Sequence, residues 1–177
     1  MDEISLKTLG RHLQTLRQSN GLSLTQLATQ AGIAKSNLSR LEQGDGNPTI
    51  DTLWRLAREL AVPFGTLVAP MATAMDDNGI TLRLIEQSQG DPAVDAYLMR
   101  CAPDTLRRAE SHARGTRETI QVIGGRLEAG PAGETKPLAA GDIFTFSADQ
   151  PHDYRTSDMA ATLLVTIVYA REAETNA

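Results

Sequence analysis

SLTQLATQAGIAKSNLSRLEQG, residues 23–44, predicts two short helices separated by a turn at Gly32. Ser23 and Gln26 have the S-x-x-Q spacing of a capping box, in which each residue satisfies a free backbone N–H of the other at a helix start. The second helix is expected over residues 34–44 and ends at a glycine, a residue common just after a helix. Two short helices joined at a glycine are typical of a helix-turn-helix.

The second helix is expected to have two different faces. Ala34, Leu38 and Leu41 recur at helical spacing and predict one apolar face. The opposite face has no acidic residue before Glu42 and carries hydrogen-bonding side chains: Ser36, Ser39, Arg40 and Gln43, with Lys35 and Asn37 beside them. These side chains suit the edges of DNA bases, and they also suit the solvated face of a small helical bundle.

Helical patterns extend on both sides of this stretch. Leucines at helical spacing run along residues 5–20 and stop at Gly21, and Thr49 precedes a further amphipathic segment over residues 50–61. The short stretch FGTLV adds a last turn. Residues 1–68 are therefore predicted to form an all-α domain of five helices.

The rest of the chain has the pattern of an all-β domain. Residues 69–79, APMATAMDDNG, are small, polar and turn-forming and predict a linker. Residues 80–172 then contain short apolar or alternating runs separated by Gly, Pro and Asp: 80–87, 94–102, 119–130, 142–148 and 162–170. Several short strands at this spacing predict a β-sandwich or barrel.

Composition and charge limit the function classes. Lys and Arg number seven in residues 1–70 against six Asp and Glu, but ten against sixteen in residues 71–177, for a net charge of −5. A chain of this charge is not expected to bind nucleic acid nonspecifically, so any DNA contact must be local and geometric.

The expected compartment is the cytoplasm. The chain has a single cysteine, Cys101, which excludes an internal disulfide framework. The opening residues, MDEISLKTLG, contain acids and no apolar block, so no secretory signal peptide is expected. The longest apolar run, AATLLVTIVYA, is too short to cross a bilayer and is interpreted as a buried strand.

Residues 6–68 resemble the phage-repressor type, or XRE family, of DNA-binding domains. The resemblance rests on the capping box, Gly32, the Glu42-Gln43-Gly44 sequence, Pro48 and the register of the helices. It implies that the second short helix enters the major groove of a double-stranded operator. Arg pairs well with guanine and Asn with adenine. The residues expected to contact DNA are Thr25, Gln26, Lys35, Ser36, Asn37, Arg40, Gln43, Asn47 and Thr49.

In this family, the positions of Arg17 and Glu42 commonly pair. The resemblance therefore implies that Glu42 ties the first helix to the end of the recognition helix and does not read a base. Both side chains are expected to be largely buried and hydrogen-bonded to each other.

The carboxy-terminal half resembles the cupin family, whose fold is a double-stranded β-helix, or jelly-roll barrel. SHARGTRETIQVIGGRL is similar to the first cupin motif and GDIFTFSADQPHDYRT to the second. His112, Glu118 and His152 match three residues of the family's metal site, whereas Arg114 occupies the place of its remaining His. Ser147 replaces the usual Pro of the second motif, and Thr156 replaces its final Asn.

Three interpretations of this incomplete motif remain open. His112, Glu118 and His152 can hold a divalent metal such as zinc, iron, manganese or nickel. Alternatively, Arg114 binds the carboxylate of a small effector while these three residues, with Tyr154 nearby, hold its other end. The third interpretation is a metal-free barrel in which the His and Glu side chains satisfy each other. In all three, the side chains are expected to converge in one cavity.

The order of the two modules resembles a bacterial family of transcriptional regulators whose cupin domain senses a small molecule. Within it, the chain is most similar to the sulfur-utilisation type, and other relatives regulate polyamine or amino-acid metabolism. A homodimer on a pseudo-palindromic operator is expected, because one recognition helix contacts too few base pairs to select an operator from a genome. No membrane partner is expected. Two other classes stay open, namely a cupin metalloenzyme fused to a DNA-binding domain and an antitoxin-like interaction protein.

Overall fold

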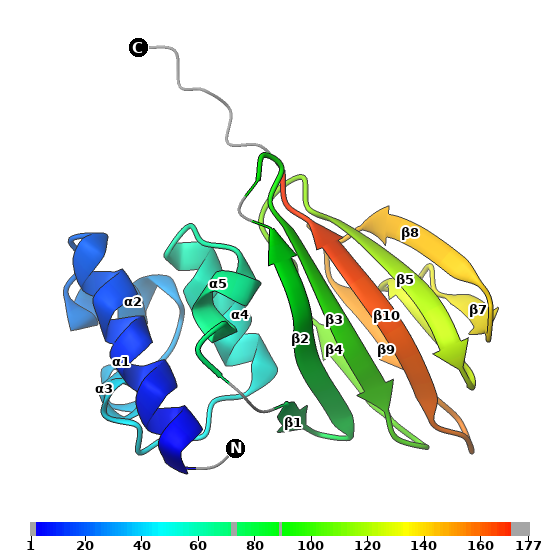
Figure 1. The fold of residues 1–177 in the computed structure, drawn as a ribbon, viewed down its shortest axis with the longest axis horizontal. Helices are drawn as coiled ribbons and strands as arrows, with labels where there is room; N and C mark the ends of the chain where they lie inside the picture. Colours follow the sequence, from blue (N-terminus) through cyan, green and yellow to red (C-terminus); the bar gives the residue numbers. More distant parts are fainter. Residues whose placement is uncertain (1–2, 72–73, 89, 171–177) are drawn as a thin grey trace. The chain divides into compact units, whose positions relative to one another are not determined.

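The structure, a computed structural model, describes residues 3–71, 74–88 and 90–170 (Figure 1). Contacts between residues divide the chain into two compact units, residues 1–84 and 85–177. The first contains the helices and the second most of the strands. Within the described residues, every helix is too short or too polar to cross a bilayer.

The helical domain has the five helices that the sequence predicts. They are α1 (Glu3–Ser19), α2 (Leu24–Gln30), α3 (Lys35–Gln43), α4 (Ile50–Glu59) and α5 (Phe64–Val68). The core consists of leucines from all five helices together with Trp54 and Phe64, whose rings stack with centroids 4.1 Å apart. Burial of these aromatic and leucine side chains supplies most of the stability of so small a domain.

The predicted helix ends are confirmed at the capping residues. The Gln26 N–H donates to Ser23 Oγ and the Ser23 N–H donates to Gln26 Oε1, which completes the capping box. Thr49 caps α4 through its hydroxyl, and Gly44 ends α3 in the left-handed conformation. The prediction was wrong for Ala34, which is exposed and caps α3 with extended backbone, so it lies outside the apolar stripe.

The close approach of α1 to α3 depends on a glycine that the sequence pattern did not single out. A Cβ at Gly10 would lie 2.4 Å from the carbonyl oxygen of Leu41 and 2.8 Å from that of Glu42. Only a residue without a side chain lets the two backbones pack at this distance. Gly10 thus fixes the end of α3 against the middle of α1.

Part of the segment predicted as a linker is regular structure. Strand β1 (Met75–Asp77) lies within residues 69–79 and pairs with the start of β2 (Ile80–Ser88). Asn78 and Gly79, both with positive φ, form the tight turn between them. Met75 is buried, and this burial favours a strand over an irregular linker.

The remaining strands complete two antiparallel sheets (Figure 1). The six-stranded sheet has the order β1-β2-β3-β10-β5-β8, and the four-stranded sheet has the order β4-β9-β6-β7. The strands not yet given are β3 (Val94–Cys101), β4 (Leu106–Ala109), β5 (Arg117–Gly124), β6 (Arg126–Pro131), β7 (Lys136–Ala139), β8 (Ile143–Ser147), β9 (His152–Arg155) and β10 (Ala161–Val168).

Alternating burial shows which side chains face the interior of the barrel. Along β10, Ala161, Leu163, Val165 and Ile167 are buried and the residues between them are half-buried. Along β5, the inward positions are Glu118, Ile120 and Val122. Glu118 is thus a buried carboxylate, and burying a charge is costly unless it has hydrogen-bonding or charged partners in the interior. The predicted fold class, a helix-turn-helix domain followed by a cupin barrel, is confirmed.

Candidate functional site

The polar face of α3 lies on the surface of the helical domain. Leu38 and Leu41 are buried and hold the helix against the core. The five residues of α3 expected to contact DNA are all exposed: Lys35, Ser36, Asn37, Arg40 and Gln43. The structure therefore presents a continuous hydrogen-bonding surface along one side of the helix.

Two of these side chains have contacts within the domain. Nη2 of Arg40 donates to the carbonyl oxygen of Asp45 (3.1 Å), and Nε2 of Gln43 donates to Ser39 Oγ (3.3 Å). Both bonds are exposed, so water or a base edge can replace them at small cost. Arg40 has further N–H groups for a second acceptor.

The other residues expected to contact DNA lie at the starts of α2 and α4. Thr25, Gln26, Asn47 and Thr49 are all exposed. Gln26 uses its side-chain oxygen in the capping box, which leaves its NH2 group for another acceptor. Thr49 Oγ1 accepts from the Thr52 N–H.

An acidic residue, Asp77, contributes to the start of α4. Its Oδ2 accepts a hydrogen bond from the Ile50 N–H (3.0 Å), at the first residue of the helix. A carboxylate is favoured at a helix N-terminus because the N–H groups there lack partners within the helix. This contact was not predicted, because the pairing of a strand residue with a helix start 27 positions away has no local signal.

Arg17 and Glu42 form the ion pair expected between α1 and α3. Nε and Nη2 of Arg17 donate to the two carboxylate oxygens of Glu42 at 2.6 and 2.8 Å. Nη1 donates to the carbonyl oxygen of Leu22 (2.8 Å). The side chains are only 10% and 6% exposed. This bidentate pair is therefore held out of water, with several donors of the guanidinium satisfied.

The barrel brings together His112, Glu118 and His152. One ligand atom from each lies within 4.8 Å of the others, and all three residues are buried. Glu118 Oε2 lies 3.5 Å from His112 Nε2 and 3.6 Å from His152 Nε2. Glu118 lies on β5 and His152 on β9, so the two sheets both contribute to the cluster.

Tyr154 completes the surroundings of the carboxylate. Its hydroxyl donates to Glu118 Oε1, so the two oxygens of Glu118 have different partners. Burial opposes the ionisation of Glu118, but hydrogen bonds from His112 and Tyr154 and the nearby imidazoles keep its pKa below its ordinary value. Burial lowers the pKa of His112. The cluster therefore favours an ionised Glu118 with a neutral His112.

The tautomer of His152 follows from the contact of its Nδ1 atom with a backbone carbonyl. Nδ1 lies 3.0 Å from the carbonyl oxygen of Gln150, which can only accept, so Nδ1 carries a proton. In the neutral imidazole, Nε2 then presents a lone pair toward Glu118 Oε2. A histidine fixed in this way is arranged as metal-binding histidines usually are.

His112 lies in the connection before β5, and its N–H donates to the carbonyl oxygen of Ala148. Arg114 is exposed in the following turn and does not line the buried cluster. The Gly115 N–H lowers the pKa of Asp149, with a smaller contribution from the charge of Arg114. The charge of Arg114 thus acts on Asp149, outside the buried cluster.

The structure adds Arg107, for which the sequence predicted no role. Arg107 lies on β4 directly opposite Tyr154 of β9. It is half-buried, whereas Leu106 and Arg108 on either side are exposed. The alternation of exposed and more buried residues along β4 marks Arg107 as an inward position. A strand of four residues is too short for this alternation to be recognised from sequence.

Cys101 is a core residue. It is buried on β3, and burial raises the pKa of its thiol to about 12. A thiol in this state is not a nucleophile at neutral pH.

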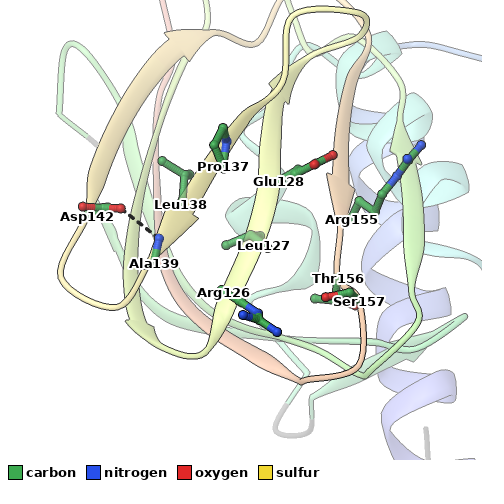
Figure 2. A pocket seen from close by; sticks show the side chains of 10 residues that line it. All are labelled: Arg126, Leu127, Glu128, Pro137, Leu138, Ala139, Asp142, Arg155, Thr156 and Ser157. Atoms are coloured by element: carbon green, nitrogen blue, oxygen red, sulfur yellow. Dashed lines mark hydrogen bonds between the residues drawn. The ribbon is translucent and has the colours of Figure 1, made fainter.

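An open groove of about 350 Å³ lies over β6, β7 and the end of β9 (Figure 2). The charged residues that line it have partners nearby. Arg126 pairs with Asp158 (3.0 Å), and Asp142 accepts from the Ala139 N–H (2.8 Å). Arg155 and Glu128 lie opposite each other on adjacent strands. We place the candidate site at His112, Glu118 and His152 because their polar atoms converge where water is excluded.

Comparison with known protein families divides the chain in the same way. Residues 13–67 match the helix-turn-helix family, and residues 97–168 match the cupin domain family. The first match contains α2, α3 and α4, and the second contains Glu118, His152 and Arg107.

Two relatives match nearly the whole chain. The HTH-type transcriptional regulator SutR of Escherichia coli is 31% identical over 160 residues, which cover 85% of this chain and 90% of that protein. A crystal structure of a helix-turn-helix family transcriptional regulator from Vibrio cholerae superposes with a TM-score of 0.86 and 26% identity, over 96% of this chain and all of that one. The transcriptional repressor RghR of Bacillus subtilis is 34% identical over 64 residues.

Proposed function

Because the chain belongs to the DNA-binding transcriptional regulators that join a helix-turn-helix domain to a cupin domain, we propose that it binds its operator as a homodimer and responds to a small molecule held in the barrel. The observation that carries the proposal is the buried convergence of His112, Glu118 and His152 in a unit separate from the exposed polar face of α3. We infer that the protein works in the cytoplasm, where its operator lies.

The exposed face of α3 supplies the base-reading surface in this proposal. Asn37 and Arg40 can each present two hydrogen-bonding groups to a base edge, and Ser36 and Gln43 lie at the same helical spacing. Lys35 lies near the backbone or a base. The starts of α2 and α4, with Thr25, Gln26, Asn47 and Thr49, position the helix by contacts to phosphates.

Replacing Arg40 by alanine should weaken binding to the operator by about 1–3 kcal/mol and leave binding to random DNA almost unchanged. The reason is that a base contact is lost only on the sequence that offers the base. Titration of both DNAs at one salt concentration measures the difference. Asn47→Ala is the matched control, since loss of a phosphate contact weakens both DNAs alike. Equal weakening by Arg40→Ala would make Arg40 a phosphate contact.

A dimer is proposed because one recognition helix contacts too few base pairs to select an operator from a genome. Two copies related by a two-fold axis would read half-sites about one helical turn apart. Two exposed apolar side chains on neighbouring strands of the six-stranded sheet, Ile123 and Ile143, support the barrel as the dimer surface.

Sedimentation should therefore show a dimer at micromolar concentration and two copies bound to each operator. Ile143→Lys should shift the protein toward monomer and weaken operator binding, because burying an unpaired charge at an interface is costly. Ala132→Lys, in the exposed connection between β6 and β7 of the other sheet, is the matched control. A wild-type monomer that binds as one copy per operator would contradict the proposal.

A second candidate ligand of the barrel is a divalent metal such as zinc, iron, manganese or nickel. When the His152 imidazole is neutral, its Nε2 lone pair faces the Glu118 carboxylate, and 3.6 Å separates Nε2 from Oε2. Both groups are electron-pair donors, so a cation between them would be bound by both. Two histidines and one carboxylate suit such metals and leave open positions for a ligand. This set also occurs in oxygenases, so a cupin enzyme is the alternative function.

Two measurements distinguish these possibilities. Genomic DNA fragments captured by the protein give the operator, and a thermal-shift screen of amino acids, polyamines, sulfur metabolites and metals gives the barrel ligand. A ligand at a hundred times its Kd adds about 2.7 kcal/mol of stability. Metal analysis with turnover assays of the same preparation tests the enzyme. Turnover without any captured operator would overturn the regulatory function.

A further inference from the structure

Each of the two sheets ends in two edge strands, and β8 differs from the other three. The strand orders place β1 and β8 at the edges of one sheet and β4 and β7 at the edges of the other (Figure 1). An edge strand has unpaired backbone groups to which another strand can add, and charged side chains or proline at the edge oppose this addition. The sequences of β1, β4 and β7 are MDD, LRRA and KPLA, so each contains charged residues. The sequence of β8, IFTFS, contains neither a charged residue nor a proline.

The backbone of β7 is closed to a further strand. The Ala140 N–H donates to the Gly125 carbonyl at the start of β6, so the N–H groups at alternate positions point away from β6. Two such positions are Pro137 and Ala139. Pro137 has no N–H, and the Ala139 N–H already donates to Asp142 Oδ2 (2.8 Å). This edge therefore has no free N–H at either position.

The outer edge of β8 has backbone groups without partners. The Ala148 N–H donates to the Thr116 carbonyl, next to the β5–β8 ladder. In an antiparallel pair, residues that bond to the neighbouring strand alternate with residues whose N–H and C=O groups point away from it. Ile143, Thr145 and Ser147 therefore direct their backbone groups away from β5. Within the described part of the chain, no residue is hydrogen-bonded to these groups.

The side chains of β8 also leave this edge accessible. Ile143, Thr145 and Ser147 are exposed, whereas Phe144 is half-buried and Phe146 is buried. The Ile143 side chain is 65% exposed. A strand added at this edge would cover part of the isoleucine, and removal of apolar surface from water favours association.

A second copy of β8 matches this edge in pattern and in charge. Two antiparallel β8 strands related by a two-fold axis at Thr145 would pair over their full length, with Ile143 opposite Ser147 of the second copy. Because β8 has no charged side chain, this pairing brings no like charges together. The same arrangement of β4 would place Arg107 opposite Arg108 of the second copy, which is unfavourable. A two-fold axis is also what a pseudo-palindromic operator requires of a dimer.

We propose that two copies of the protein dimerise by pairing their β8 strands edge to edge, which joins the two six-stranded sheets into one continuous sheet. This inference rests on the proposed function, in which the protein binds its operator as a homodimer. It identifies the strand that forms the dimer and the register in which the two copies meet.

Disulfide trapping in the full-length protein tests the register. Directly opposite residues of a hydrogen-bonded pair have Cα atoms about 5.5 Å apart, which is within reach of a disulfide. Thr145→Cys should therefore give a covalent dimer on mild oxidation, and a reducing agent should reverse it. The native Cys101 is buried, so the wild type should not cross-link.

Gln121→Cys is the matched control for the trapping experiment. Gln121 is exposed on β5, directly opposite Ile143. In the proposed dimer, the two copies of this position are separated by three strand spacings, or at least about 14 Å. This distance is too long for a disulfide, so Gln121→Cys should stay uncross-linked. A dimer that packs through the faces of the sheets could instead bring the Gln121 positions together.

A proline substitution tests the backbone hydrogen bonds. Thr145→Pro removes an outward N–H and keeps the bonds between β8 and β5, and proline is tolerated in edge strands. Sedimentation should show a dimer dissociation constant raised about 10- to 100-fold, because two hydrogen bonds are lost in each dimer. Thr145→Ala is the matched control, since it loses the same hydroxyl contact with Thr119 (2.9 Å) but keeps the N–H. It should dimerise as the wild type does.

The outcomes separate this inference from the proposed function. If the wild type is a dimer and Thr145→Cys does not cross-link, the homodimer stands and the β8 pairing is wrong. An unchanged dissociation constant in Thr145→Pro would overturn the pairing as well. The trapping experiment keeps the wild-type backbone, so it decides the question even if Thr145→Pro folds poorly. A wild-type monomer would leave the β8 edge to a different partner, and both the homodimer and the β8 pairing would then be wrong.

Discussion

Arg17→Ala is expected to lower the free energy of unfolding of the helical domain by about 3–5 kcal/mol, and Glu42→Ala should do the same. Each change leaves the other charge buried, since the two side chains are only 10% and 6% exposed. Arg17→Ala also removes the donor to the Leu22 carbonyl at the start of the turn before α2. Chemical denaturation followed by circular dichroism gives these values.

A double variant identifies the cause of the loss. Arg17→Met combined with Glu42→Leu strands no charge, so it should cost less than either alanine substitution. The exposed pair of Lys7 and Glu3 on α1 is the matched control, and Lys7→Ala should leave the free energy of unfolding nearly unchanged. Two results would show that Arg17 and Glu42 do not act as a buried pair. One is a loss of less than about 1 kcal/mol of unfolding free energy in the single variants. The other is a loss in the double variant that equals the sum of the single losses.

The helical domain could be predicted closely because its signals are local. The capping box at Ser23, the glycine after α3 and the leucine spacing act within one or two turns of helix. Gly10 and Asp77 escaped prediction because their roles depend on backbone or side-chain contacts with residues far away in the sequence.

The long strands of the barrel were predicted, and some of its short strands, such as β4, were missed. Strands β3, β5 and β10 are each eight residues long and carry clear apolar patterns. Strand β4 has four residues with two arginines, so no apolar pattern marks it. Its inward residue, Arg107, is recognised only through its pairing with Tyr154.

The candidate site was also predicted only in part. The motif spacing predicted that His112, Glu118 and His152 converge, and their ligand atoms do so within 4.8 Å. Sequence matching placed Arg114 with them because it stands where the family has a histidine. The direction of a side chain in a turn depends on backbone angles and not on its place in a motif, and this turn leaves Arg114 exposed.

Replacing both His112 and His152 by alanine should abolish the response of operator binding to effector. In wild-type protein, the effector is expected to change operator affinity by about 1–3 kcal/mol, a common size for coupling between sites. The double variant should keep the operator affinity of effector-free wild type, because α3 belongs to the other unit. Operator titrations with and without the amino acid or metal found in the thermal-shift screen measure both quantities.

Asp153→Asn is the matched control. Asp153 lies between His152 and Tyr154 on β9, but it is only half-buried, whereas these two neighbours are buried. It should retain the full response.

We infer that the coupling runs through residues 69–79, where the Asp77 carboxylate accepts from the first N–H of α4. Asp77→Ala should therefore reduce the response and leave effector binding intact, since this contact lies outside the barrel cluster. A normal response in the double histidine variant would contradict the barrel site, whereas a normal response in Asp77→Ala alone would contradict only this route.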